Sequence, residues 1–406
     1  MPSRRHLLAG VGTLLVATGT GATRSADTPH EPTSSPLDWP MSRHDPRGSG
    51  YNPDVSGPTS DVEPAWVYEA PNWFHGASAP IRLDDMVYAT GGGLIACSAQ
   101  DGTQGFARSG PYTSSLAAVE APSYLTRTLA TTSTGGLYGL NAGGGIAIPG
   151  TDRGIGTQRW SGPPRNEYRP TIEHTPTTNP VAVDGTIYTP VVGTNDLVAV
   201  NAANGSVHWR TTVVDDEVIS ASFGRPAVDD DAVYIANWPN RVSAYDRTDG
   251  TLLWQREREE QMQLSTSVTD AGVVVTTRSG VALLDTDDGE PIWERDLDGN
   301  ATSGAPAVTT ERVLVGDGLE EFHALDLETG EVEWSIPFEG ETKPVVADGI
   351  VYAVERNASL VALDVDSGEE RFRYEPPEVP LSPPIVGDER LFLVNRSRIL
   401  ALEGSR

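Results

Sequence analysis

Short apolar runs separated by polar turns recur along most of this 406-residue chain. Residues 351–372 read VYAVERNASLVALDVDSGEERF, and residues 313–334 read VLVGDGLEEFHALDLETGEVEW. In both stretches two strand-length apolar runs flank a polar break, and an Asp and a Gly then precede an aromatic residue. Short runs of this kind, with almost no helical periodicity, predict an all-β protein.

The clearest copies of the pattern share the form A-x-D-x-x-x-G-x-x-x-W, as in AYDRTDGTLLW (244–254) and ALDLETGEVEW (324–334). A proline leads a further apolar run in most units, as in APAVTTERVL (305–314). The second copy, GLNAGGGIAIP (139–149), lacks the aromatic residue, and Trp160 is a second candidate for that place. The Asp position recurs eight times, at intervals of 38 to 60 residues: Ser98, Asn141, Asn201, Asp246, Asp285, Asp326, Asp364 and Glu403.

These intervals and the four strand signals in each unit predict the blades of a propeller. The eighth copy, ALE (401–403), stops after its third strand, which would leave an open sheet edge. EPAWVYEA (63–70) carries Trp66 but has no first three strands of its own, so it is suited to fill that place. We therefore expect residues 61–406 to form an eight-bladed β-propeller of four-stranded antiparallel blades, the last of which is closed by an N-terminal strand. A chain that begins at Glu63 should then keep its fold, and one that also lacks residues 63–70 should be destabilised.

Each repeated residue type has a structural role in such a blade. The Asp carboxylate can accept hydrogen bonds from backbone N–H groups of the turn, and the Gly can adopt a positive φ. The aromatic residue offers a large apolar face for packing between neighbouring blades, and the small residue at the Ala position leaves space for the ring of the next blade. We assign this docking role to six residues: Trp66, Trp209, Trp254, Trp293, Trp334 and Phe372.

The repeated motif resembles the tryptophan-docking motif of pyrroloquinoline quinone (PQQ) repeat propellers, and residues 324–334 match it at every fixed position. The resemblance extends over residues 61–406, whereas WD-repeat and kelch propellers fit less well because no Trp-Asp dipeptide ends a blade. The family comprises quinoprotein dehydrogenases and non-catalytic relatives, such as the outer-membrane assembly factor propeller of bacteria. WPMSRHDPRGSGYNP (39–53) also resembles the lead-in segment of secreted PQQ-like proteins from haloarchaea.

The resemblance leaves two functions open. The leading one is a non-catalytic propeller that acts as a protein-interaction or assembly scaffold. The alternative is a quinoprotein dehydrogenase that binds PQQ and a divalent cation in the central channel. The resemblance implies that such enzymes hold PQQ above a tryptophan and typically add a vicinal disulfide, a cation site of Glu, Asn and Asp, and a catalytic Asp.

The residues favour the scaffold. The chain has a single cysteine, Cys97, and no matching set of cation ligands outside the repeat turns. It also lacks the motifs G-x-S-x-G, H-E-x-x-H and C-x-x-C. We therefore assign no catalytic or metal-binding residue, expect no bound cofactor, and leave any PQQ-binding residue unassigned.

Charge narrows the set of partners. The chain has 57 acidic and 29 basic residues, a net charge of −28, and Lys343 is its one lysine. Such a field repels nucleic acid and anionic membranes. A lysine-poor acidic surface is also typical of proteins from salt-loving organisms. We expect a monomer with an unidentified protein partner and no nucleic acid ligand.

The N-terminus predicts export. Arg4 and Arg5 precede an apolar run and then small residues, in the manner of a twin-arginine signal peptide over residues 1–26. The run is shorter than the roughly 20 apolar residues that span a bilayer, so we expect no stable membrane insertion once the signal is removed. Residues 27–60 are expected to form a Pro/Ser/Thr-rich tether and lead-in segment. These features predict a secreted or cell-surface protein.

Two stretches break the repeat and are candidates for partner contact. APNWFHGAS (70–78) is rich in aromatic residues, and RWSGPPRNEYRPTIEHTP (159–176) gathers basic and aromatic residues in the longest interval. Such a cluster on an acidic protein is a candidate contact patch, because insertions map to propeller faces. The alternative is an ordinary long loop over the channel mouth. The candidate residues are Trp73, Phe74, His75, Arg165, Tyr168, Arg169 and His174.

Overall fold

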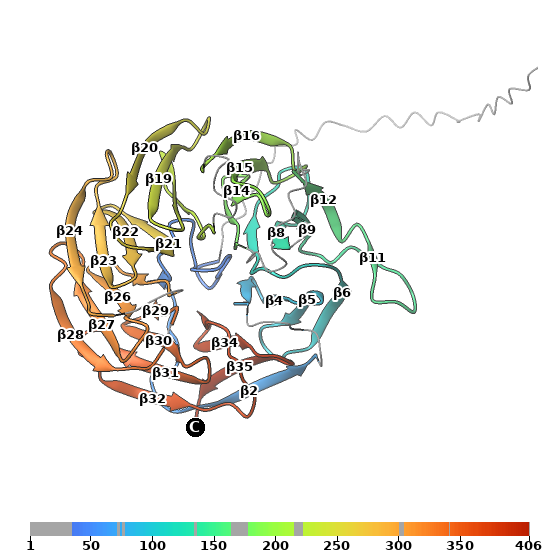
Figure 1. Cartoon of the computed structure of the whole chain (residues 1–406). Helices are drawn as coiled ribbons and strands as arrows, with labels where there is room; N and C mark the ends of the chain where they lie inside the picture. Colours follow the sequence, from blue (N-terminus) through green and yellow to red (C-terminus); the bar gives the residue numbers. More distant parts are fainter. Residues whose placement is uncertain are drawn as a thin grey trace, which may run out of the picture. The chain divides into compact units, whose positions relative to one another are not determined.

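Every regular element within the described part of the chain is a β-strand. Eight sheets are arranged as the blades of a propeller, and a two-stranded hairpin forms a further small sheet (Figure 1). The structure is a computed structural model that describes residues 35–70, 74, 78–133, 136–163, 178–214, 222–299, 304–340 and 342–405. Within those ranges no helix is present that could span a bilayer. The prediction of an all-β, eight-bladed propeller is therefore confirmed.

Blades 1 to 4 follow one another along the chain. Blade 1 contains β3 (Ile81–Leu83), β4 (Met86–Thr90), β5 (Gly93–Ser98) and β6 (Gln104–Ser109). Blade 2 contains β7 (Ala117–Val119), β8 (Thr128–Ser133), β9 (Gly136–Asn141) and β12 (Gln158–Gly162), and the hairpin β10 (Ile146–Ala147) and β11 (Gly154–Ile155) lies between its last two strands. Blade 3 contains β13 (Val181–Val183), β14 (Thr186–Pro190), β15 (Asp196–Asn201) and β16 (Val207–Thr212). Blade 4 contains β17 (Ala227–Val228), β18 (Ala232–Asn237), β19 (Arg241–Asp246) and β20 (Leu252–Glu257).

Blades 5 to 8 complete the ring. Blade 5 contains β21 (Met262–Thr269), β22 (Gly272–Thr277), β23 (Gly280–Leu284) and β24 (Pro291–Asp296). Blade 6 contains β25 (Ala307–Val308), β26 (Arg312–Gly316), β27 (Glu321–Asp326) and β28 (Val332–Pro337). Blade 7 contains β29 (Val345–Ala347), β30 (Ile350–Glu355), β31 (Ser359–Asp364) and β32 (Glu370–Tyr374), with β1 (Tyr51–Asn52) as a fifth strand. Blade 8 contains β33 (Ile385–Gly387), β34 (Arg390–Val394), β35 (Arg398–Gly404) and β2 (Val62–Glu69).

The N-terminal strand closes the last blade. β2 pairs antiparallel with β35, and Trp66 lies opposite Ala401 in the register. In Figure 1 the blue β2 lies beside the red β35. The chain ends after the third strand of blade 8, so β2 supplies the fourth strand and covers what would be an open edge. The predicted closure by residues 63–70 is confirmed.

The pairing register of the strands explains why the Ala position of the repeat needs a small side chain. Ala244 lies opposite Trp254 in blade 4, and Ala324 lies opposite Trp334 in blade 6. The small side chain therefore leaves room for the aromatic residue of its own blade. From the sequence we expected this side chain to face the ring of the next blade, because the sequence alone does not give the pairing register.

Tryptophans on the outer strands join each blade to the next. The indole N–H of Trp209 donates to Arg247 O at 3.0 Å, and that of Trp254 donates to Thr286 O at 2.7 Å. The acceptor is in each case the carbonyl just after the Asp position of the following blade. The other bonds of this kind are Trp66 to Ala99, Trp160 to Ala202, Trp293 to Leu327 and Trp334 to Val365. The side chain of Phe372 has no N–H group to donate. It is buried beside Tyr352, with the ring centroids 6.4 Å apart.

The turn glycine receives this tryptophan. Gly250 has a φ of 74°, and a Cβ atom at this position would lie 2.6 Å from the ring of Trp209. Gly289 and Gly330 face Trp254 and Trp293 in the same way. Glycine is therefore required here both for the left-handed backbone and for the close approach of the ring.

The segment of residues 35–60, which we call the axial segment, is bonded to the inner strands of the ring. It belongs to the same compact unit as the blades, Ser35–Arg406. In Figure 1 its blue trace passes inside the ring. Trp39 exchanges two backbone hydrogen bonds with Arg82 of blade 1, and Pro40 O accepts from Ala118 N of blade 2 at 2.8 Å.

The bonds continue around the ring in blade order. Pro46 O, Arg47 O, Ser49 O and Gly50 O accept from the inner-strand amides of blades 4, 5, 6 and 7, which are Val228, Val268, Val308 and Val346. Asn179 of blade 3 donates to Ser42 Oγ at 3.1 Å, and Glu389 N of blade 8 donates to Ser56 O at 3.2 Å. The inner strand of each blade is an edge strand, so these carbonyls satisfy amides that have no strand partner on that side. Residues 35–60 are thus part of the propeller unit, although sequence analysis placed them outside it.

Replacing Gly250 with Ala should destabilise the protein by about 2–4 kcal/mol. About 1 kcal/mol comes from the left-handed backbone, and the remainder comes from displacing the ring of Trp209. Gly150→Ala is the matched control, because Gly150 has a φ of 76° and open space around its Cβ position. Urea denaturation of both variants measures the difference. Equal losses of stability in the two would show that the ring contact contributes nothing.

A chain that begins at Ser35 should unfold at the same temperature as the full chain, whereas one that begins at Asp61 should lose at least about 5 kcal/mol of stability. The second variant loses seven backbone carbonyls that accept hydrogen bonds from the blades, each contributing roughly 0.5–1.5 kcal/mol, and the buried ring of Trp39. This argues against the expectation that a chain beginning at Glu63 keeps its stability. Thermal unfolding followed by circular dichroism compares the three chains, and equal midpoints for all of them would contradict the role given to the axial segment.

Candidate functional site

Most of the contact patch predicted from sequence lies outside the described residues: Trp73, His75, Arg165, Tyr168, Arg169 and His174. Phe74 is described, and its side chain is 2% exposed. It packs in a core cluster with Trp39 and residues of blades 1, 7 and 8. In this structure Phe74 therefore presents no side-chain surface to a partner.

A pocket of about 200 Å³ lies in the central channel. Its wall comes from residues next to the inner strands of blades 1, 2, 3, 7 and 8, and the axial segment contributes Trp39, Ser42 and Arg43. Lys343, which is exposed, belongs to the same wall. The pocket could not be predicted from the sequence, because its side chains come from six separate parts of the chain.

Arg43 of the axial segment is buried beside this pocket. Its guanidinium donates to Pro344 O at 2.5 Å and to Pro306 O, which are the carbonyls of the repeat prolines of blades 7 and 6. Burial, with a smaller effect from the charge of Arg225, lowers the pKa of Arg43 to about 9. The side chain lies against Gly50, where a Cβ atom would be 2.2 Å from a guanidinium nitrogen.

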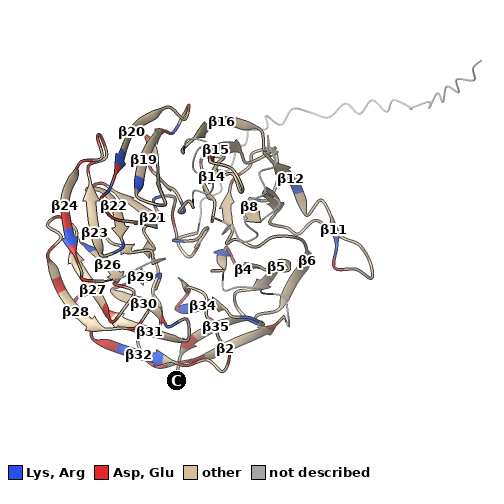
Figure 2. Cartoon of the chain, viewed as in Figure 1, with Lys and Arg blue, Asp and Glu red and all other residues tan. Residues whose placement is uncertain are grey.

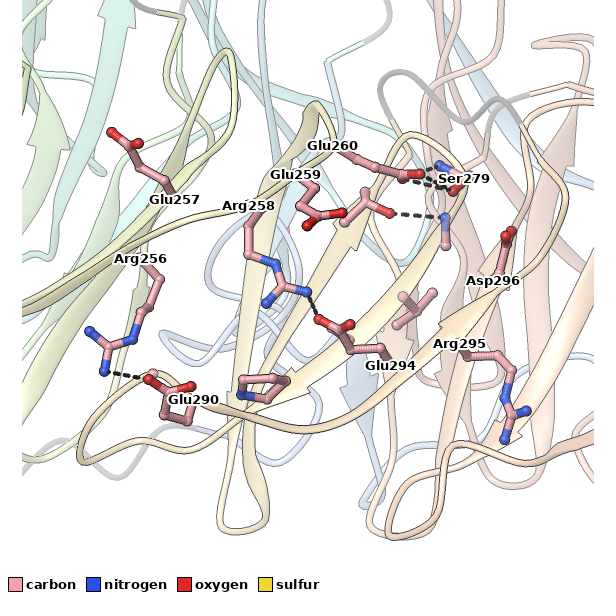
Figure 3. Close-up of a pocket in the computed structure, with 16 residues that line it drawn as sticks. Arg256, Glu257, Arg258, Glu259, Glu260, Ser279, Glu290, Glu294, Arg295 and Asp296 are labelled. Carbon is pink, nitrogen blue, oxygen red and sulfur yellow. Dashed lines mark hydrogen bonds and ion pairs between the residues drawn. The ribbon is translucent and has the colours of Figure 1, made fainter.

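A groove of about 460 Å³ lies between the outer strands β20 and β24 of blades 4 and 5 (Figure 3). Arg256 pairs with Glu290 at 3.0 Å, and Arg258 pairs with Glu294, so each pair links the two blades. Glu260 accepts a hydrogen bond from Ser279, which lowers the pKa of Glu260. These are surface ion pairs between neighbouring blades, each contributing roughly 0–1 kcal/mol. Among the described residues that line the groove, none is His or Cys.

Blade 2 carries exposed apolar side chains that sequence analysis missed. Ile146 and Ile155 of the β10–β11 hairpin are 73% and 66% exposed, and Leu125 of the preceding loop is fully exposed. Ile148 and Tyr124 are also exposed. We call these five residues the blade 2 patch. The sequence feature that could have indicated this hairpin is the long repeat interval after Asn141, part of which the hairpin occupies.

The hairpin is held in place by polar contacts to blade 1. Arg108 donates to Gly144 O at 3.0 Å, Ser109 N donates to Asp152 O at 3.0 Å, and the Ser109 hydroxyl also bonds the Asp152 carboxylate. On the loop side, the guanidinium of Arg159 lies 3.9 Å from the ring centroid of Tyr124. The apolar groups are therefore presented by a fixed surface.

Charge is distributed unevenly around the ring. In Figure 2 red segments are frequent along the outer side of blades 5 to 7, near β24, β28 and β32, whereas the ribbon of blade 2 is largely tan. Between residues 117 and 162, which include blade 2, there are two acidic and three basic residues. Between residues 307 and 337 of blade 6 there are eight acidic residues and one basic residue. The blade 2 patch thus lies on the part of the ring with the least negative charge.

With the fold described, comparison with known proteins identifies the family. The sequence profile described as outer membrane protein assembly factor BamB matches residues 147–295 and 277–405. The chain belongs to the BamB family. BamB of Yersinia pestis is 29% identical over 230 residues, which cover 50% of this chain and 58% of that protein. BamB of Salmonella typhimurium is 29% identical over 263 residues, covering 48% of this chain and 67% of that one.

Solved structures share the fold at low sequence identity. BamB from Moraxella catarrhalis superposes with a TM-score of 0.62 at 14% identity, covering 84% of this chain and 100% of that chain. A quinohemoprotein alcohol dehydrogenase from Pseudomonas putida HK5 superposes with a TM-score of 0.68 at 12% identity, covering 91% of this chain and 81% of that chain. Both likenesses concern the PQQ-like propeller fold and not its chemistry.

Among the described residues, the channel pocket lacks features that the dehydrogenase resemblance implies for a PQQ site. The pocket of about 200 Å³ is smaller than the roughly 300–1,000 Å³ of typical ligand pockets. Asn179 is among its lining residues, but none of those residues is Asp or Glu. Across the described residues no cluster of three or more His, Cys, Asp or Glu side chains is placed to hold a metal ion. Cys97 is buried in blade 1, where burial raises the pKa of its thiol to about 12.

Proposed function

We propose that this BamB-family propeller is a non-catalytic scaffold that binds a protein partner outside the cytoplasm. The blade 2 patch is the observation that carries the proposal. Exposed Ile side chains on a fixed hairpin, with the exposed Leu125 in the preceding loop, are unusual on a chain with a net charge of −28. They offer an apolar contact area where electrostatic repulsion of a partner is weakest.

The partner that fits this surface is a protein with an apolar patch. A strongly anionic partner is excluded by the acidic blades 5 to 7, whose field reaches about a Debye length from the surface. The names of the relatives, outer membrane protein assembly factors, support a role in assembly. The small channel pocket, with no Asp or Glu among its described lining residues, favours this role over the alternative of a PQQ-dependent dehydrogenase.

We place the protein at the cell surface or in the medium, as a monomer exported by the twin-arginine pathway. The support is the predicted signal over residues 1–26, which lies outside the described residues. The acidic, lysine-poor composition supports a salt-adapted source of the haloarchaeal secreted type.

Photo-crosslinking in cells of the native host tests the scaffold. A photoreactive phenylalanine analogue at Ile148 should give one discrete crosslinked product, and Ile155→Glu in the same chain should reduce its yield at least about fivefold, because a charge would be buried in the contact. The matched control has the analogue at Leu253, which is 50% exposed on blade 4, with Ile292→Glu as its second change. Equal crosslinking at Ile148 and Leu253 would contradict the patch.

Two further experiments test the rest of the proposal, the first on the purified chain and the second in cells of the host. Addition of PQQ with calcium should give no dye-linked oxidation of alcohols or sugars; such oxidation with a shifted cofactor absorbance would favour the dehydrogenase. Changing Arg4 and Arg5 to Lys should retain the chain in the cytoplasm, and unchanged export would exclude the twin-arginine route.

A further inference from the structure

Two buried guanidinium groups lie at the axis of the propeller. Arg43 and Arg225 are 8% and 6% exposed. Arg225 donates to Asp45 O at 2.6 Å and to Pro226 O at 3.0 Å, and Arg43 donates to Pro344 O and Pro306 O. All four acceptors are backbone carbonyls. Among the described residues, neither group has a carboxylate within 4.0 Å.

One carboxylate lies nearby, and it is already engaged. Asp45 accepts hydrogen bonds from the backbone N–H of Ser49 at 3.0 Å and from the Ser49 hydroxyl, and its carboxylate lies 3.8 Å from the ring of His44. Burial opposes ionisation, but these neighbours outweigh it and lower the pKa of Asp45. With two guanidinium groups and one carboxylate, the axis has an excess of one positive charge. A buried charge of this kind is costly unless an opposite charge or further acceptors compensate it.

A bound group with a negative charge or further acceptors can reach Arg43 through the channel pocket. Arg43 lines it, and so do the hydroxyl-bearing residues Ser42 and Ser115 and the ammonium-bearing Lys343. The Nε–H of Arg43 and the indole N–H of Trp39 are buried without a hydrogen-bond partner. The described lining of the pocket therefore includes two positively charged groups and no carboxylate, although the chain as a whole is strongly acidic.

We propose that the channel pocket binds a small oxyanion, a carboxylate or a phosphate, between Lys343 at its mouth and Arg43 at its base. A volume of about 200 Å³ selects a small molecule. The pocket offers several N–H and O–H donors. An anion with more than one oxygen can accept from several of them at once, so an oxyanion suits the pocket better than a spherical halide. The positive pocket within an acidic surface focuses anions at the channel mouth. This inference does not depend on the proposed scaffold function, because the pocket and the blade 2 patch are formed by different side chains.

Calorimetric titration of the full-length protein at constant ionic strength tests the site, with sodium phosphate, sodium malonate and sodium chloride as separate probes. Saturable binding of phosphate or malonate is expected, with at least tenfold tighter binding than chloride. Binding of phosphate alone would point to a phosphorylated ligand, and binding of malonate alone would point to a carboxylate. Either anion should also raise the unfolding temperature, since a ligand of the native state stabilises it.

Variants separate the site from a general salt effect. Lys343→Gln should weaken the binding at least about fivefold, because a neighbouring charge is removed, and Lys343→Arg should restore it. Arg153→Gln, which removes one exposed charge from the hairpin, is the matched control and should leave binding unchanged. Arg43 is not used as the primary variant because its bonds to blades 6 and 7 hold the fold. Equal responses to all three anions, or unchanged binding in Lys343→Gln, would overturn the proposal.

Discussion

Backbone hydrogen bonds between the axial segment and the inner strands are the constraint on which this propeller depends. A ring of blades places its inner edge strands around an axis where they have no further strand to pair with. Here the carbonyls of Pro40, Pro46, Arg47, Ser49 and Gly50 accept from those strands in blade order. With the further bonds of Trp39, Ser42 and Ser56, this short segment is linked to all eight blades, in addition to the closure of blade 8 by β2. It also occupies the channel, which determines what size of ligand the axis can accept.

The same arrangement divides the molecule into regions with different chemistry. Arg43 and Arg225 lie at the axis, and Arg43 lines the channel pocket. Blade 6 is strongly acidic, whereas blade 2 carries exposed isoleucines and few acidic residues. The tryptophan contacts between blades are the same in kind from one blade to the next, so they contribute stability without distinguishing one face from another. Function is therefore expected at the irregular places, which are the hairpin of blade 2 and the pocket above the axial segment.

The blades could be predicted from sequence because each repeat unit must make the same turn and the same contacts with its neighbours. An Asp that accepts turn amides, a Gly with positive φ and a Trp that reaches the next turn recur with fixed spacing, and the missing fourth strand of blade 8 identified β2. The axial segment could not be predicted in this way, because its contacts use backbone carbonyls, which every residue type has. Its contacts are also spread over eight blades, so no local pattern marks them. Trp160 was harder to place because the β10–β11 hairpin separates it from the turn at Asn141. Phe74 was assigned to the contact patch from the aromatic content of residues 70–78, which does not distinguish a core side chain from a surface one.

Amide hydrogen exchange at the inner strands tests most directly whether the axial segment holds the ring. The amides of Arg82, Ala118, Val228, Val268, Val308 and Val346 donate to the axial segment. If the account is right, these amides exchange only through global unfolding, at the slowest rates in the protein. If they exchange as fast as amides of exposed turns while the blade strands β18 and β30 stay protected, the segment is not a stable part of the propeller and the central claim fails.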